Sequence, residues 1–124
     1  METYFIRHTE QLDINEETFN GLIKKNLIAI HFPYKKSQDE KNDSKSINPN
    51  DYHLSNNKES IRTFCQLAKE GGYVCAEYRR IPGATVGKVT PNTKIGFLKG
   101  EWGERSGQQG RTAILKILPL KQIQ

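Results

Sequence analysis

The chain has little cysteine, no long apolar run and no recognisable leader. Among its 124 residues are two cysteines, Cys65 and Cys75, which do not form a Cys-x-x-Cys pair. We therefore expect no paired-cysteine metal motif but two reduced, buried thiols. No apolar stretch approaches the roughly 18 residues that span a bilayer, and the first residues lack the apolar region of a signal peptide. These absences predict a cytoplasmic protein without a membrane partner.

Acidic residues are scarce in one half of the chain. Residues 1–72 hold ten Lys/Arg and eleven Asp/Glu, a balance of −1, whereas residues 73–124 hold nine and three, a balance of +6. The two balances add up to the net charge of +5. An uneven positive charge of this kind is typical of a surface that meets a polyanion, and nucleic acid is the commonest one.

The N-terminal half predicts a strand, a helix and a second strand. Residues 4–6 are aromatic and β-branched, which favours a first strand. Asp13 and Asn15 are candidate N-caps for a helix with an apolar stripe. The apolar run at residues 27–32 predicts a buried strand that Pro33 ends.

A polar stretch at about residues 34–57 predicts a long loop, with little regular structure before residue 51. Connections of this length are uncommon in compact domains and are either functional or mobile. We expect Asn56 or Asn57 to cap a second helix, which Gly71 and Gly72 end.

From residue 73 the apolar period changes to two, which predicts four strands joined by turns. These strands are expected at residues 73–79, 85–89, 94–98 and 112–118. Gly87 lies inside one of them and indicates a bulge or a close approach of another segment. The length suits one domain over residues 1–124. We predict an α+β fold, a small half-open mixed barrel of about six strands with two helices packed on its side.

The residues give little support for catalysis. Gly83 and the Gly87-Lys88 pair have one residue too few between them for a P-loop, and a strand follows. The three histidines lie far apart in the sequence, so we predict neither a metal site nor a cofactor. Glu77 remains an alternative as the centre of a small metal-dependent nuclease, although pairing with an arginine on a neighbouring strand is the more common role.

Basic and aromatic residues alternate through the strand-rich half, which is the pattern expected for nucleic-acid binding. The basic residues expected to contact backbone phosphates are Arg79, Arg80, Lys88, Lys94, Arg105 and Arg111. The aromatic residues expected to wall a base pocket by stacking are Tyr34, Tyr52, Tyr78 and Trp102. Tyr73, Phe97 and Lys99 belong to the same pattern. For Trp102 the alternative is a ring folded back over apolar surface.

Four stretches, at residues 4–7, 72–78, 86–89 and 113–121, are similar in order to the PUA-like superfamily, with the EVE and YTH modules closest. The resemblance implies a small barrel that takes a nucleobase, often a methylated one, into an aromatic-walled pocket and performs no chemistry itself. Such modules occur as N-terminal specificity domains of modification-dependent restriction enzymes, including the McrB type. It further implies a piece of a longer protein, with a nuclease or motor on another domain or chain.

Three alternatives remain open at this stage. The same fold can bind RNA in place of DNA, because contacts to the 2′-hydroxyl are too local to recognise in a sequence. The nuclease centred on Glu77 is a second alternative. A protein-binding regulatory domain is a third, if the basic residues prove to be scattered over the surface.

Overall fold

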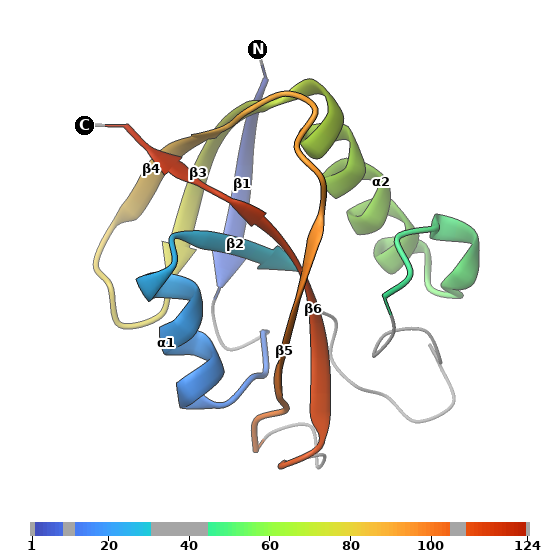
Figure 1. The fold of residues 1–124 in the computed structure, drawn as a ribbon, viewed down its shortest axis with the longest axis vertical. Coiled ribbons are helices and arrows are strands. Elements are labelled where there is room, and N and C mark those ends of the chain that lie inside the picture. Colours follow the sequence, from blue (N-terminus) through green and yellow to red (C-terminus); the bar gives the residue numbers. More distant parts are fainter. Residues whose placement is uncertain (1, 9–11, 31–44, 105–108, 124) are drawn as a thin grey trace.

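The computed structural model describes residues 2–8, 12–30, 45–104 and 109–123. In these residues the fold is α+β, with two α-helices, a short 3₁₀ helix and seven strands in two sheets (Figure 1). We expected about six strands in a half-open barrel, but the two sheets are not closed into one. No helix of the described residues is long and apolar enough to cross a membrane.

The first sheet has four strands in the order β1-β3-β4-β7: β1 (Thr3–His8), β3 (Gly72–Tyr78), β4 (Ala84–Val89) and β7 (Lys121–Gln122). β1 runs parallel to β3, and the other pairs are antiparallel. A parallel pair needs a long crossover, and both α-helices and one strand lie between β1 and β3 in the sequence. Period-two burial along β3 leaves one face of this sheet outside the core.

The second sheet is antiparallel in the order β2-β6-β5: β2 (Leu27–Ile30), β6 (Thr112–Pro119) and β5 (Gly96–Glu101). After β6 the chain crosses to the first sheet through the buried Leu120. Only glycine fits at position 87, because a Cβ there would lie 2.5 Å from Leu120 Cγ. The predicted close approach at this glycine is confirmed, whereas the predicted end of β2 at residue 33 lies outside the described residues.

Helix α1 (Glu16–Lys24) begins after Asn15, one of its two candidate N-caps. The side chain of Asn15 accepts a hydrogen bond of 2.9 Å from the backbone N–H of Thr18, which satisfies one free donor of the first turn. Two glutamates lie in the first turn and Lys24 in the last, where each sign of charge opposes the helix dipole. Asn26 has a φ of 53°, a left-handed conformation that asparagine adopts more readily than most residues after a helix.

The described part of the polar stretch contains one short element, the 3₁₀ helix η1 (Pro49–Asp51). It ends at residue 51, up to which we expected little regular structure. The Asn48 side chain accepts a hydrogen bond from the N–H of Asn50, and proline fits the first helical turn. Residues 31–44 lie outside the described residues.

Helix α2 (Ser55–Glu70) starts before the predicted cap. Its N-cap is Leu54, which makes no side-chain capping bond, and Asn57 is buried within the first turn. Tertiary burial therefore overrides the capping preference of asparagine. The predicted stop is confirmed, since Gly71 has a φ of 72° and donates its N–H to Leu67 O.

The main core lies between the two sheets and is closed by apolar faces of both helices. Phe19 and Leu22 enter it from α1, and Phe64 and Leu67 enter it from α2. A smaller cluster forms around Tyr52 and Ile61.

Two buried polar side chains join the sheets. The fully buried His8 ring has Nδ1 3.1 Å from Glu77 O and accepts a 3.0 Å hydrogen bond at Nε2 from Ala29 N–H. These partners fix a neutral ring with the proton on Nδ1. Tyr78 stacks on this ring at a centroid distance of 4.4 Å and donates its hydroxyl to Leu27 O at 2.7 Å. β1 and β3 are thus bonded to β2 across the core.

Candidate functional site

The face of the first sheet that points away from the core carries alternate residues of β1, β3 and β4. Cross-strand pairing places them in three rows, because directly paired residues share a face. From one end of the sheet to the other, the rows are Thr3-Tyr73-Lys88-Lys121, Phe5-Cys75-Val86 and Arg7-Glu77-Ala84. We call this set of residues the outer face.

The outer face exposes an unusual amount of apolar surface. Phe5 is 79% exposed, Tyr73 40% and Val86 44%. Ile123 donates its N–H to Val86 O at 3.1 Å, which extends the row of Phe5 by one more exposed side chain. Four of the seven exposed large hydrophobic residues in the described part of the chain therefore gather here. Exposed apolar side chains that gather on one face are a common feature of interaction sites.

Charge on the outer face is positive and lies mainly at one end. Lys88 and Lys121 pair directly in the row of Tyr73. At the other end, the Arg7 guanidinium is 3.7 Å from a Glu77 carboxylate oxygen. The face carries three basic residues and one acidic residue, a net charge of +2. Since Arg7 is paired with Glu77, this net charge is carried by Lys88 and Lys121. The face thus combines aromatic rings with a cationic margin.

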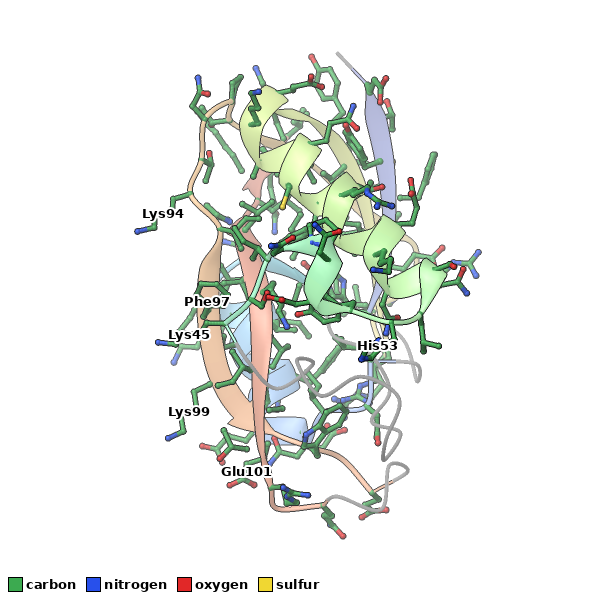
Figure 2. All side chains as sticks on the ribbon, turned by 90° about the vertical axis from the view of Figure 1, so that its right-hand side faces the viewer. Lys45, His53, Lys94, Phe97, Lys99 and Glu101 are labelled. Atoms are coloured by element: carbon green, nitrogen blue, oxygen red, sulfur yellow. The ribbon has the colours of Figure 1, made fainter. Side chains whose placement is uncertain are left out.

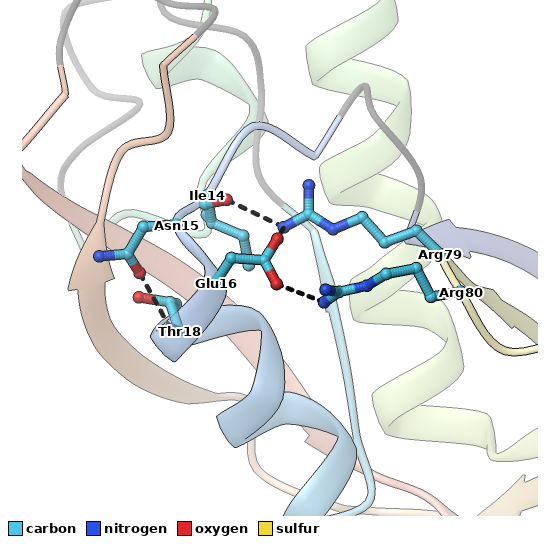
Figure 3. A network of polar contacts seen from close by, with 6 residues as sticks. All are labelled: Ile14, Asn15, Glu16, Thr18, Arg79 and Arg80. Atoms are coloured by element: carbon cyan, nitrogen blue, oxygen red, sulfur yellow. Dashed lines mark hydrogen bonds and ion pairs between the residues drawn. The ribbon is translucent and has the colours of Figure 1, made fainter.

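Arg79 and Arg80, predicted to bind phosphates, contact residues at the N-terminus of α1 (Figure 3). Arg79 donates to Ile14 O at 2.9 Å, and its guanidinium carbon lies 4.3 Å from the centroid of the Phe19 ring. Both arginines form ion pairs with Glu16. Because these contacts engage both guanidinium groups, the geometry favours a structural role for the two arginines.

The remaining basic residues do not form one surface. Lys88 lies on the outer face, whereas Lys94 and Lys99 lie on the β5 side of the other sheet, where Phe97 also lies (Figure 2). Arg111 is exposed just before β6, and Arg105 lies outside the described residues.

One basic residue of the strand-rich half is not at the surface. Lys116 is fully buried in β6, with its Nζ 5.5 Å from the centroid of the Tyr52 ring. The surface charge of this half is therefore lower than the sequence count indicates.

The predicted aromatic pocket residues that the structure describes are buried. Trp102 is 0%, Tyr52 1% and Tyr78 6% exposed, so none presents a ring face to solvent. Burial raises the pKa of Tyr78 to about 12, as expected for a hydroxyl whose role is structural. For Trp102 this is the alternative of a ring folded back over apolar surface. Tyr34 lies outside the described residues.

Two clefts lined by described residues bear on the expected pocket. One of about 540 Å³ runs between β1 and α2 and shares Phe5 and Arg7 with the outer face. The other, of about 630 Å³, lies between α1 and β5 and includes Lys24 and Lys99 together with Glu101. Neither is lined by the three buried aromatic residues, so neither is the expected aromatic pocket.

The nuclease alternative gains no support from the geometry. Glu77 pairs with Arg7 on the neighbouring strand, which is the structural role favoured for it in the sequence. In the described ranges, no group of three or more His, Cys, Asp or Glu side chains lies close enough to hold a metal ion.

Sequence reasoning missed Phe5, Val86 and Lys121 as members of a surface. The missing information was the pairing of β1 with β3 and of β4 with β7. The polar residues Thr3 and Arg7, each two positions from Phe5, were the signal that could have marked an outward-facing phenylalanine.

Comparison of the chain with protein-family models, with curated proteins and with solved structures found no match.

Proposed function

We propose that the chain is a nucleic-acid-binding module and that the outer face is its contact surface. One observation supports this most directly: Phe5 and Tyr73 are exposed on neighbouring strands, and Lys88 and Lys121 lie in the row of Tyr73. Stacking of a base on an aromatic side chain contributes about 1–3 kcal/mol, and lysines neutralise phosphates. The net charge of +5 favours association with a polyanion.

Reading of a modified or flipped base, within a restriction system, remains a prediction of the PUA-like resemblance. Such reading needs an open aromatic cage, and the described residues provide none because Tyr52, Tyr78 and Trp102 are buried. We therefore assign base stacking to the outer face. DNA is the expected polymer and RNA the alternative. Catalysis is expected on another domain or chain.

Fluorescence anisotropy with labelled DNA and RNA oligonucleotides tests the proposal. We expect binding that weakens steeply between about 50 and 200 mM salt. Lys88→Ala and Lys121→Ala should each weaken binding and lower the salt slope by about 1. Lys94→Ala and Lys99→Ala are matched controls, since they remove the same charge from the β5 side, and they should leave affinity nearly unchanged.

Two results would contradict the proposal. The first is no binding of DNA or RNA at low salt. The second is binding that depends on Lys94 and Lys99 but not on the outer-face lysines, which would place the contact on the β5 side. Sedimentation of the protein alone tests whether a second copy of the chain binds the outer face. A dimer that Phe5→Ala dissociates, together with no oligonucleotide binding, would identify the face as a protein interface.

A further inference from the structure

We infer that the nucleic acid taken by the outer face is single-stranded, with Phe5 and Tyr73 each stacking on one unpaired base. This inference rests on the proposed function and specifies its ligand. It depends on the spacing of the two rings, the place of the positive charge and the chemistry of the centre of the face.

The backbone positions of the two aromatic residues are farther apart than successive bases of one stack. Phe5 pairs with Cys75, and Tyr73 pairs with Thr3, so the rings are diagonal neighbours on adjacent strands. A strand spacing of about 4.8 Å and a two-residue rise of about 6.6 Å place their Cα atoms about 8 Å apart. Successive bases in a duplex are about 3.4 Å apart. Two bases that each cover one ring must therefore separate from one another, as only an unpaired strand allows.

The centre of the face is apolar and lacks the features that read a duplex. Phe5, Cys75 and Val86 form its middle row, and this surface suits the flat faces of bases better than charged phosphates. A duplex covers its base faces by stacking, and its grooves are read by a helix or a two-stranded ribbon that inserts into them. The outer face is formed by neighbouring strands of one sheet. Such a face is flat and does not insert into a groove.

The charge distribution indicates at which end of the outer face the phosphates of the bound strand lie. Lys88 and Lys121 lie beside Tyr73, while the Arg7–Glu77 pair closes the opposite end. Phosphates are therefore expected at the Tyr73 end. Two rings on one sheet match a footprint of about two or three nucleotides.

The experiment compares a labelled single strand of DNA, its blunt duplex and an RNA strand of the same sequence at one salt concentration. The wild-type chain should bind at least one of the single strands about tenfold or more tightly than the duplex. Phe5→Ala and Tyr73→Ala should each weaken single-strand binding by about 5- to 150-fold, the range for one stacked base, and leave duplex binding within about twofold. Phe5→Tyr, which keeps the ring, should bind as the wild type does.

Ile47→Ala is the matched control, since Ile47 is also exposed, at 41%, but lies outside the outer face. Its single-strand affinity should not change. Thermal melts of all variants check folding, and truncation of the 79%-exposed Phe5 should leave the melting temperature nearly unchanged. In a Cys65→Ser background, the single strand should also slow alkylation of Cys75, which lies beside Phe5 on the face.

Different results would contradict the single-strand inference and the proposed function. Duplex bound as tightly as the single strands, or ring variants that weaken both equally, would overturn the inference while the lysine-dependent binding of the proposed function stands. Absence of binding to all three probes would overturn both.

Discussion

The burial of His8 makes the stability of the fold depend on pH. Its ring is fully buried, accepts a hydrogen bond from Ala29 N–H and lies between strands of both sheets. Burial disfavours the charged form and lowers the pKa of His8 from 6.5 to about 4, against a smaller opposing effect of the bond to Glu77 O. A proton added at Nε2 would also leave Ala29 N–H facing a second donor.

The sign and size of the effect follow from this lowered pKa. The unfolded chain binds the proton more tightly, so the stabilisation is complete above pH 6.5. It is lost progressively as the pH falls from about 6.5 to about 4 and changes no further below that. The pKa difference corresponds to a loss of about 3 kcal/mol over this window. This is a large share of the stability of a small domain.

The assay is denaturant unfolding at about pH 7, 6, 5 and 4, followed by the fluorescence of Trp102, the single and fully buried tryptophan. His8→Gln removes the titrating group, so it should be less stable than the wild type at pH 7 and approach it as the pH falls. His53→Gln, at an exposed histidine, is the control for removal of a histidine outside the core. Parallel curves for wild type and His8→Gln would refute the reasoning, because other titrating groups cancel in the difference.

Two further predictions concern the structural contacts. Arg79→Ala should lower the free energy of unfolding by about 2 kcal/mol, because it removes a charged donor from the half-buried bond to Ile14 O. Arg80→Ala, whose side chain is 59% exposed, should cost less than about 1 kcal/mol; equal losses in chemical denaturation would contradict this difference. Gly100→Ala should cost about 1–3 kcal/mol, because the new Cβ would overlap Thr18 Cγ2. A double variant that adds Thr18→Ser, which removes that methyl group, should recover part of the loss in thermal melts, and no recovery would exclude the clash as its cause.

Local signals predicted most of the elements. Three features act within a few residues and can therefore be predicted from the sequence. They are the Asn15 cap, the glycines after α2 and the period-two stretches after residue 72. The errors fall where packing competes with local preference. α2 starts before its best capping residue, and β7 is too short to show a period of its own.

The candidate site was predictable only in its chemistry. Basic and aromatic residues predicted a polyanion as the partner. Their positions could not be predicted: Tyr78 and Trp102 are buried in the core, and Arg79 forms an ion pair with Glu16 of α1. An aromatic residue or an arginine counts equally in the composition whether its side chain is buried or exposed. Only strand pairing decides which face it joins.

The sequence by itself determined the α+β class, the strand-rich second half and the positive charge, because these depend on composition and short-range periodicity. The tertiary structure alone decided that Phe5, from the start of the chain, lies diagonally across from Tyr73 on one open face. It also decided that Lys121, from the end of the chain, pairs with Lys88 there. These contacts join residues far apart in the sequence, and their register is fixed by burial of the opposite face of the sheet.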